Sequence, residues 1–241
     1  MKIMKKHLIA WIVIKLALLG IFWIFAFSNW HGVQLAQISP TPTPEVSSDK
    51  IDRPTSNPYK GDLSRYDKEG RAEKLQIQRV MDLLRISEGK MVADIGAGGG
   101  WFSVIAAERI GEKGKVYAVD INEDAITYIN DRKIRENVPN IEAVLGDFDD
   151  PKLPKKSIDA VLILNTYHEI EEPIVFMKNL LPALKKDALV GIIDRDGTGG
   201  NHGIDEATLI NEAKRAGFTL KERFDFVNAS NMDYFLIFKE A

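Results

Sequence analysis

The sequence predicts an α/β fold, a doubly wound and mostly parallel sheet with helices on both faces, over residues 61–241. Two observations lead to this prediction. Short apolar runs alternate with amphipathic stretches of helical period, which is typical of parallel strands joined by crossover helices. The last two apolar runs are separated by only four residues, which is too short for a crossover helix. They therefore predict a closing antiparallel hairpin.

The elements follow one another in a regular order. A helical pattern opens the domain between Arg71 and Leu84, with its apolar residues on one stripe. Buried strands are expected at Met91–Ile95, Lys115–Val119, Ile141–Leu145, Ile158–Leu164 and Ala188–Ile193. Helices are expected between them at Trp101–Ile110, Glu123–Glu136, Ile174–Leu184 and Glu206–Ala216. The hairpin is expected from Leu220–Val227 and Met232–Lys239.

The N-terminal segment, residues 1–36, predicts one hydrophobic helix that is either a membrane anchor or a signal peptide. Leu8–Phe27 is twenty residues long with one charge, Lys15. At ~1.5 Å per residue this length matches a bilayer core. A cleaved leader would end near Ala36. Lysines precede the span and none follows until Lys50, so both alternatives place the domain on the non-cytoplasmic side, anchored or exported.

A proline-rich linker is expected over residues 37–60. Five of the ten prolines lie here, three of them in the Pro-Thr-Pro-Thr-Pro run at 40–44. Such a run favours an extended polyproline II chain without a packed core. We therefore expect a spacer between the membrane segment and the domain.

Charge and cysteine content exclude several classes of function. The net charge is −3, and residues 1–27 contain four lysines and no acid, so the remaining chain is more acidic than the whole. An acidic domain repels phosphate backbones, which disfavours a nucleic-acid partner. The chain has no cysteine, which excludes disulfides, cysteine-ligated metals and thiol nucleophiles. No His/Asp cluster with metal-ligand spacing stands out, so no metal site is expected.

A glycine-rich loop joins the first expected strand to the helix after it. It runs from Asp94 to Gly100 with the pattern Asp-x-Gly-x-Gly-x-Gly. Glycines allow a sharp turn and bring backbone N–H groups against a ligand. The G-x-G-x-x-G spacing of nicotinamide-dependent enzymes does not fit. Counted from Gly96, Trp101 stands where the third glycine is needed, and counted from Gly98, Ser103 stands there.

Polar residues follow three more strands. Asp120 ends the second strand, 26 residues after Asp94, where a carboxylate can accept hydrogen bonds from two ribose hydroxyls. Asp147 and Phe148 follow the third strand, and Asn165 follows the fourth. Because ligands lie beyond the carboxyl ends of strands in open α/β sheets, these residues are expected at one site.

These motifs, in this order, resemble class I S-adenosylmethionine (SAM)-dependent methyltransferases over about 170 residues. The resemblance implies a Rossmann-like sheet of seven strands with the last one antiparallel, and SAM as cofactor. It implies that Asp120 binds the ribose, that Asp147 and Phe148 bind adenine, and that Asn165 lines the methionine end. The cofactor-binding residues that we expect are Asp94, Gly96, Ala97, Gly98, Gly100, Asp120, Ile121, Asp147, Phe148 and Asn165.

The Thr-Tyr-His triplet at 166–168 is similar to the branch of small-molecule enzymes related to the quinone C-methyltransferases. It makes His168 and Tyr167 the candidate catalytic residues, with His168 as the better base on intrinsic pKa. A purely structural hydrogen bond is the alternative for His168, and capping of the next helix is the alternative for Glu169. The polar loop 194–203, with Arg195 and His202, is either a lid over the substrate or a surface loop.

The resemblance implies transfer of a methyl group to a small or lipophilic acceptor by in-line displacement. Such a reaction mainly requires alignment of the reacting atoms, and a base only where the acceptor is protonated. The expected export conflicts with the cytoplasmic supply of SAM. An anchored, non-catalytic SAM- or nucleotide-binding module therefore stays open as the alternative.

Overall fold

The computed structural model describes residues 51, 53, 55–197 and 203–241, which belong to a compact unit delimited as Ser48–Ala241. The expected apolar helix within 1–36, the proline run at 40–44 and His202 lie outside the described residues. Among the helices that are described, none has the length and apolar character needed to cross a bilayer.

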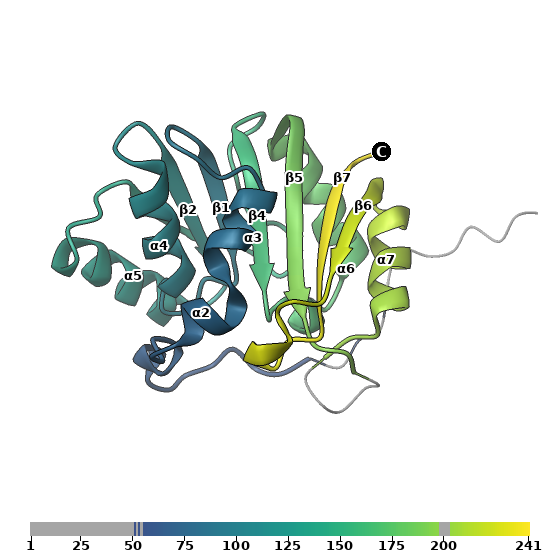
Figure 1. Cartoon of the computed structure of the whole chain (residues 1–241), viewed down its shortest axis with the longest axis horizontal. Helices are drawn as coiled ribbons and strands as arrows, with labels where there is room; N and C mark the ends of the chain where they lie inside the picture. Colours follow the sequence, from purple (N-terminus) through teal and green to yellow (C-terminus); the bar gives the residue numbers. More distant parts are fainter. Residues whose placement is uncertain (1–50, 52, 54, 198–202) are drawn as a thin grey trace, which may run out of the picture. The chain divides into compact units, whose positions relative to one another are not determined.

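The described residues form one seven-stranded sheet in the order β3-β2-β1-β4-β5-β7-β6. The strands are β1 (Met91–Ile95), β2 (Lys115–Asp120), β3 (Ile141–Leu145), β4 (Ile158–Leu164), β5 (Leu184–Asp194), β6 (Phe218–Phe224) and β7 (Tyr234–Glu240). All neighbours pair in parallel except β7, which is antiparallel to both β5 and β6. The seven-stranded α/β sheet and its closing hairpin are therefore confirmed (Figure 1).

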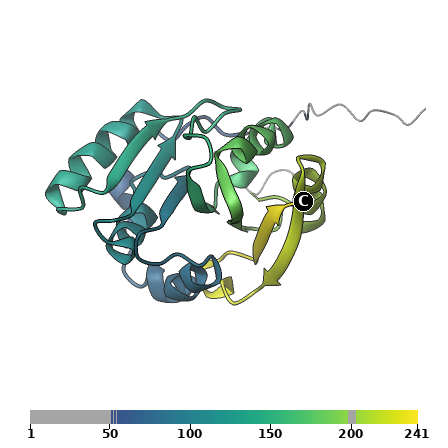
Figure 2. The same cartoon turned by 90° about the horizontal axis from the view of Figure 1, so that it is seen from above.

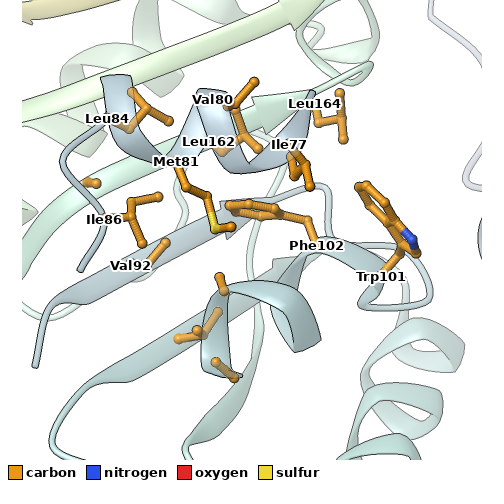
Figure 3. Packing of buried hydrophobic residues seen from close by; sticks show 14 of the residues in the cluster. Ile77, Val80, Met81, Leu84, Ile86, Val92, Trp101, Phe102, Leu162 and Leu164 are labelled. Carbon is orange, nitrogen blue, oxygen red and sulfur yellow. The ribbon is translucent and has the colours of Figure 1, made fainter. Parts of the chain in front are cut away.

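Helices cover both faces of the sheet. They are α2 (Arg71–Leu75), α3 (Ile77–Leu83), α4 (Trp101–Ile110), α5 (Glu123–Arg135), α6 (Pro173–Leu180) and α7 (Glu206–Arg215), with 3-10 turns η1 (Leu63–Tyr66), η2 (Tyr167–Glu169), η3 (Leu181–Ala183) and η4 (Asn228–Ser230). The core forms two clusters, one beneath α2, α3 and α4 and the other beneath α6 and α7. Figure 2 shows these layers from above, and Figure 3 shows α3 packed against α4 and β4.

Local chemistry explains where the crossover helices begin. Asn122 caps α5 by accepting the N–H of Asp124, and Asp205 caps α7 by accepting the N–H of Thr208. Each side chain satisfies one of the backbone donors that a helix start leaves without an intrahelical partner. Pro173 begins α6, where the missing N–H costs nothing.

The helix expected between Arg71 and Leu84 is interrupted. Gln76 adopts a left-handed φ of 48° and separates α2 from α3. Leu75 and Ile77 flank this break and are both buried, at 2% and 1% exposure. In a continuous helix two residues at i and i+2 point to nearly opposite sides, so one of them would face solvent. The break allows both to enter the core.

The next strand begins earlier than expected. The helix predicted for Ile174–Leu184 ends at Leu180, and β5 starts at Leu184 instead of Ala188. Pro182 has no N–H to continue a helical ladder. The chain therefore passes through η3 directly into the sheet.

Candidate functional site

The glycine loop leaves the carboxyl end of β1 in a conformation that requires glycine. Gly96, Gly98 and Gly100 have φ values of 69°, 53° and 70°. A Cβ atom on Gly96 would lie 2.3 Å from Cγ2 of Thr166, which follows β4. The loop is therefore packed directly against the β4 loop, and Ala97 holds it to the sheet by donating its N–H to Val119 O at 3.0 Å.

Asp120, at the end of β2, binds the glycine loop. Its Oδ2 accepts the N–H of Gly98 at 2.8 Å, and its Oδ1 accepts the N–H of Asn122 at 3.0 Å. Burial raises the pKa of Asp120, and these N–H groups oppose that change. The structure thus brings the expected ribose-binding carboxylate to the loop.

Asp94 is buried below the same loop, with 3% exposure. It accepts a hydrogen bond of 2.6 Å from the Ser103 hydroxyl. Burial raises the pKa of Asp94 to about 6, while Ser103 and the positive charge of Arg71 partly offset that rise. Asp94 therefore titrates close to neutral pH.

Apolar side chains are exposed at the carboxyl ends of β2 and β3. Ile121, Leu145 and Phe148 are 39%, 42% and 62% exposed, although large apolar residues are usually buried. Leu145 pairs in register with Asp120. Asp147 is in the same loop and forms an ion pair of 2.7 Å with Lys152. These residues offer an apolar surface and a carboxylate beside Asp120, as an adenine site requires.

Asn165 follows β4 and carries an unsatisfied polar atom. Its backbone is left-handed, with φ 53°, and its N–H donates to Ile193 O at 2.7 Å. Within the described part of the chain, the side-chain Oδ1 is buried and accepts no hydrogen bond. A buried acceptor without a donor costs about 1–3 kcal/mol. The atom is therefore suited to accept a hydrogen bond from a bound ligand.

His168 lies in η2 and is held by a carboxylate that the sequence motifs do not predict. Its Nδ1 is 2.8 Å from Asp194 Oδ1, and its backbone N–H donates to Asp194 Oδ2 at 3.1 Å. Asp194 ends β5 and is fully buried. A carboxylate on one ring nitrogen fixes the tautomer and the orientation of the imidazole. The other nitrogen, Nε2, lies 3.5 Å from Glu169 Oε1.

Tyr167 is not brought to the site. Its side chain is fully buried in the cluster beneath α6 and α7, and its hydroxyl donates to Glu212 Oε2 at 3.1 Å. Burial raises the pKa of Tyr167 well above its ordinary value, and the charge of Glu212 adds to this effect. The phenol is therefore part of the core packing beneath the turn that carries His168.

The segment before α2 lies along the carboxyl ends of the strands, as Figure 1 shows. We call the described residues 53 and 55–66 the strap. Its Tyr66 ring lies against Gly98, its Leu63 carbonyl lies against Gly99, and its Tyr59 carbonyl accepts a hydrogen bond of 2.7 Å from Asn122. Part of the expected linker over 37–60 is therefore packed on the domain. The low-complexity sequence gave no signal for these contacts.

Arg71, at the start of α2, places a positive charge beside the glycine loop. The carbon Cζ of its guanidinium lies 4.1 Å from the centre of the Trp101 ring, and its Nη1 donates a hydrogen bond of 2.9 Å to Tyr66 O. Burial lowers the pKa of Arg71, and the Asp94 carboxylate opposes that change. An acidic and a basic group thus lie together, which suits a ligand that carries both charges. No group of His, Asp or Glu residues with metal-site geometry occurs in the described ranges.

Comparison with known proteins decides the family. A family model described as a methyltransferase domain matches residues 86–229, which include β1 to β6 and all the motifs above. The chain belongs to this family. The matched region includes the glycine loop, Asp120, Asn165 and His168.

Curated relatives match about half of the chain. Aklanonic acid methyltransferase DauC of Streptomyces sp. is 28% identical over 120 residues, which is 50% of each chain. A demethylmenaquinone methyltransferase of Listeria monocytogenes is 24% identical over 117 residues, 48% of this chain and 49% of that protein. The chain therefore spans about half the length of the curated relatives that it matches.

Solved structures share the fold at low identity. A SAM-dependent methyltransferase from Aquifex aeolicus has a TM-score of 0.67 at 23% identity, covering 74% of this chain and 97% of that chain. The [4+2]-cyclase SpnF has a TM-score of 0.59 at 13% identity, covering 77% and 85%. Fibrillarin from Aeropyrum pernix, solved with bound SAM, has a TM-score of 0.54 at 12% identity, covering 70% and 74%. Because one of these is a cyclase, the fold alone does not define the reaction.

Proposed function

We propose that the domain binds SAM and transfers its methyl group to a small or lipophilic acceptor. One observation carries this proposal: the glycine loop is held at positive φ and bound through the Gly98 N–H to Asp120. In this arrangement the ends of β1 and β2 present backbone N–H groups and a carboxylate to one ligand. The motif order and the family support SAM as that ligand.

The residues present fit the three parts of SAM. Ile121 and Phe148 would cover adenine, with Asp147 near its exocyclic amine. Asp120 would accept hydrogen bonds from the ribose hydroxyls on its remaining lone pairs. At the methionine end, the unsatisfied Oδ1 of Asn165 would accept a hydrogen bond from the ammonium group. Asp94 and Arg71 supply the complementary charges nearby.

Bound SAM supplies an electrophilic methyl group, and the chain aligns the acceptor with it. His168 is the group suited to take a proton from an acidic acceptor, because the Asp194 carboxylate, 2.8 Å from its Nδ1, fixes the orientation of the ring. Tyr167 supports the turn that carries His168 and has no proton-transfer role in this proposal.

The acceptor that we propose is a quinone-like or polycyclic aromatic molecule with an ionisable hydroxyl or carbon acid. The Thr-Tyr-His triplet and the relatives named for aklanonic acid and demethylmenaquinone support this class. The apolar segment within residues 1–36 supports a further proposal, that the chain is membrane-associated with its domain on the non-cytoplasmic side.

Titration calorimetry of the full chain with SAM tests the cofactor. We expect micromolar binding, weakened about 10- to 100-fold in Asn165→Gly, because an amide oxygen that accepts from an ammonium group contributes about 1.5–3 kcal/mol. Glycine keeps the left-handed backbone, so only the amide is removed. Asn137→Gly is the matched control, since Asn137 is exposed and has the same φ of 53°.

Methylthioadenosine, which lacks the amino-acid end of SAM, should bind the wild-type chain and Asn165→Gly equally. Transfer of a labelled methyl group to demethylmenaquinone or to an anthraquinone-type hydroxyl then tests the reaction. Failure of the folded chain to bind SAM would overturn the whole proposal. Binding without transfer to any acceptor would favour the non-catalytic binding module.

A further inference from the structure

Arg53 belongs to the segment expected to be a linker, yet its side chain is only 12% exposed. Its Nη2 forms an ion pair of 2.5 Å with Oε1 of Glu212, a buried residue on α7. Its carbon Cζ lies 5.6 Å from the centre of the Tyr167 ring. Removing a guanidinium from water is costly, so a linker arginine buried in this way needs specific partners.

The remaining contacts of Arg53 go to both ends of η2. Its Nη1 donates to Tyr167 O at 3.2 Å and to Ile170 O at 3.3 Å. These two carbonyls flank His168 and Glu169 in the chain. Asp194 holds the same turn as well: its Oδ2 accepts the backbone N–H of His168, and its Oδ1 lies 2.8 Å from His168 Nδ1.

The strap contacts the turn a second time, at Ser56. Its backbone N–H donates to Glu169 Oε2 at 2.6 Å. The other oxygen of the same carboxylate, Oε1, lies 3.5 Å from His168 Nε2. The strap therefore contacts the surroundings of His168 at two points. These are the backbone of η2 and the Glu169 carboxylate beside the imidazole ring.

A short 3-10 turn has few bonds of its own to fix its position. Within η2, Glu169 N donates to Thr166 O at 2.9 Å and Ile170 N donates to Tyr167 O at 3.1 Å. Such turns have poorer hydrogen-bond geometry than α-helices. Displacing a catalytic group by ~1 Å is enough to cost on the order of a hundredfold in rate. External contacts with the two flanking carbonyls are therefore well placed to control where His168 lies.

We propose that Arg53 is a positioning residue of the acceptor side: by holding both ends of η2 it fixes His168 relative to the reacting atoms. This inference rests on the proposed function, because it assigns His168 to the acceptor. It extends the working domain toward the N-terminus, since residues before position 61 then contribute to the reaction. We expect cofactor binding to be independent of this contact, because the partners of Arg53 named above are not among the residues assigned to SAM.

Arg53→Gln in the full chain tests the inference. We expect turnover with the chosen acceptor to fall at least tenfold, while the KM and Kd for SAM stay within twofold of wild type. Amide hydrogen exchange of the peptide spanning 166–170 should accelerate at least tenfold, while exchange in the glycine loop is unchanged. Turnover and exchange of Arg53→Lys should lie between those of wild type and Arg53→Gln, because an ammonium group can pair with Glu212 without holding both carbonyls in the same geometry.

Arg223→Gln is the matched control, because Arg223 makes an exposed ion pair with Glu206 on the surface. It should leave turnover and exchange of 166–170 unchanged. If turnover and exchange of 166–170 in Arg53→Gln match those of this control, the inference is wrong. If Arg53→Gln does not fold, wild-type turnover and exchange in Arg53→Lys lead to the same conclusion. The exchange measurement needs no acceptor. Accelerated exchange in a chain that transfers no methyl group would show that Arg53 holds η2 in place, and it would overturn the proposed function.

Discussion

Burial of the Asp94 carboxyl makes the stability of the folded chain depend on pH. It is almost fully buried, and burial is the main reason why its pKa rises from the ordinary 3.8 to about 6. The folded chain therefore holds this proton at pH values where the unfolded chain has released it. By linkage, the contribution of Asp94 to stability is greatest below about pH 4 and falls as the pH rises through about 6.

Asp94→Asn should therefore stabilise the chain at neutral pH. The difference between 3.8 and about 6 corresponds to about 3 kcal/mol, which is the upper limit of the expected gain at pH 7–8. The gain should disappear toward pH 4, where both side chains are neutral. Urea unfolding at pH 4, 6 and 8 measures this, with Asp131→Asn at an exposed position of α5 as control. A gain of equal size at every pH would rule out burial of charge as the cause.

The sequence predicts the candidate site residues that lie in contiguous motifs, but not the side chains that contact them. Asp94, Asp120 and Asn165 could be selected because each follows an apolar run. Asp194 lies 26 positions from His168, and Arg53 lies 159 positions from Glu212. Only the strand order and the path of the strap bring these pairs together, so local patterns could not predict them.

At the scale of elements, the expected boundaries hold for four elements whose ends are marked by a change from apolar to polar or turn-forming residues. The bounds of β1, β3, β4 and α4 are those predicted from the sequence. Errors occur where tertiary contacts outweigh local preference. The break at Gln76 depends on the burial of both of its neighbours, and the strap depends on surfaces supplied by η2 and the glycine loop.

The packing of α3 on β5 depends on Gly191. A Cβ atom there would lie 2.9 Å from both terminal methyl carbons of Leu84, just after α3, and 2.9 Å from a ring carbon of Phe235 on β7. Both neighbours are buried and cannot move into solvent. Glycine inside a strand usually weakens it, so its presence here indicates a close approach of elements. Leu84 is labelled at the end of this packed layer in Figure 3.

Gly191→Ala should therefore lower the free energy of unfolding by about 1–3 kcal/mol through overpacking. Leu84→Val removes the contacting methyl groups and should cost about 0.5–1.5 kcal/mol alone. The double variant should be more stable than the sum of the two losses predicts, which denaturant unfolding of all four proteins measures. Strict additivity would show that the alanine methyl group does not meet Leu84. The SAM affinity should not change, because these residues lie away from the glycine loop.

At the scale of the whole molecule, the strap continues the chain that leads from the N-terminal segment. Arg53 and Ser56 contact the turn of His168, and two residues separate Arg53 from Lys50, the first lysine after the apolar span. If residues 1–36 hold the chain at a membrane, residues 37–50 tether the domain to it. A lipophilic acceptor is consistent with such a tether, and the side of the membrane then determines how SAM reaches the domain.

The side of the membrane can be measured because the chain has no cysteine. Lys113→Cys places a single thiol at a side chain that is 81% exposed, and its ion pair with Glu88 is a surface pair worth little stability. The lysines before Leu8 predict that a membrane-impermeant maleimide labels this thiol in intact cells stripped of their wall. Lys6→Cys is the control and should be labelled only after lysis. The reverse pattern would place the domain beside the cytoplasmic SAM supply and remove the conflict that export creates. Labelling of Lys113→Cys from outside would instead require a SAM source in that compartment, since the intact loop and Asp120 argue for a site in use.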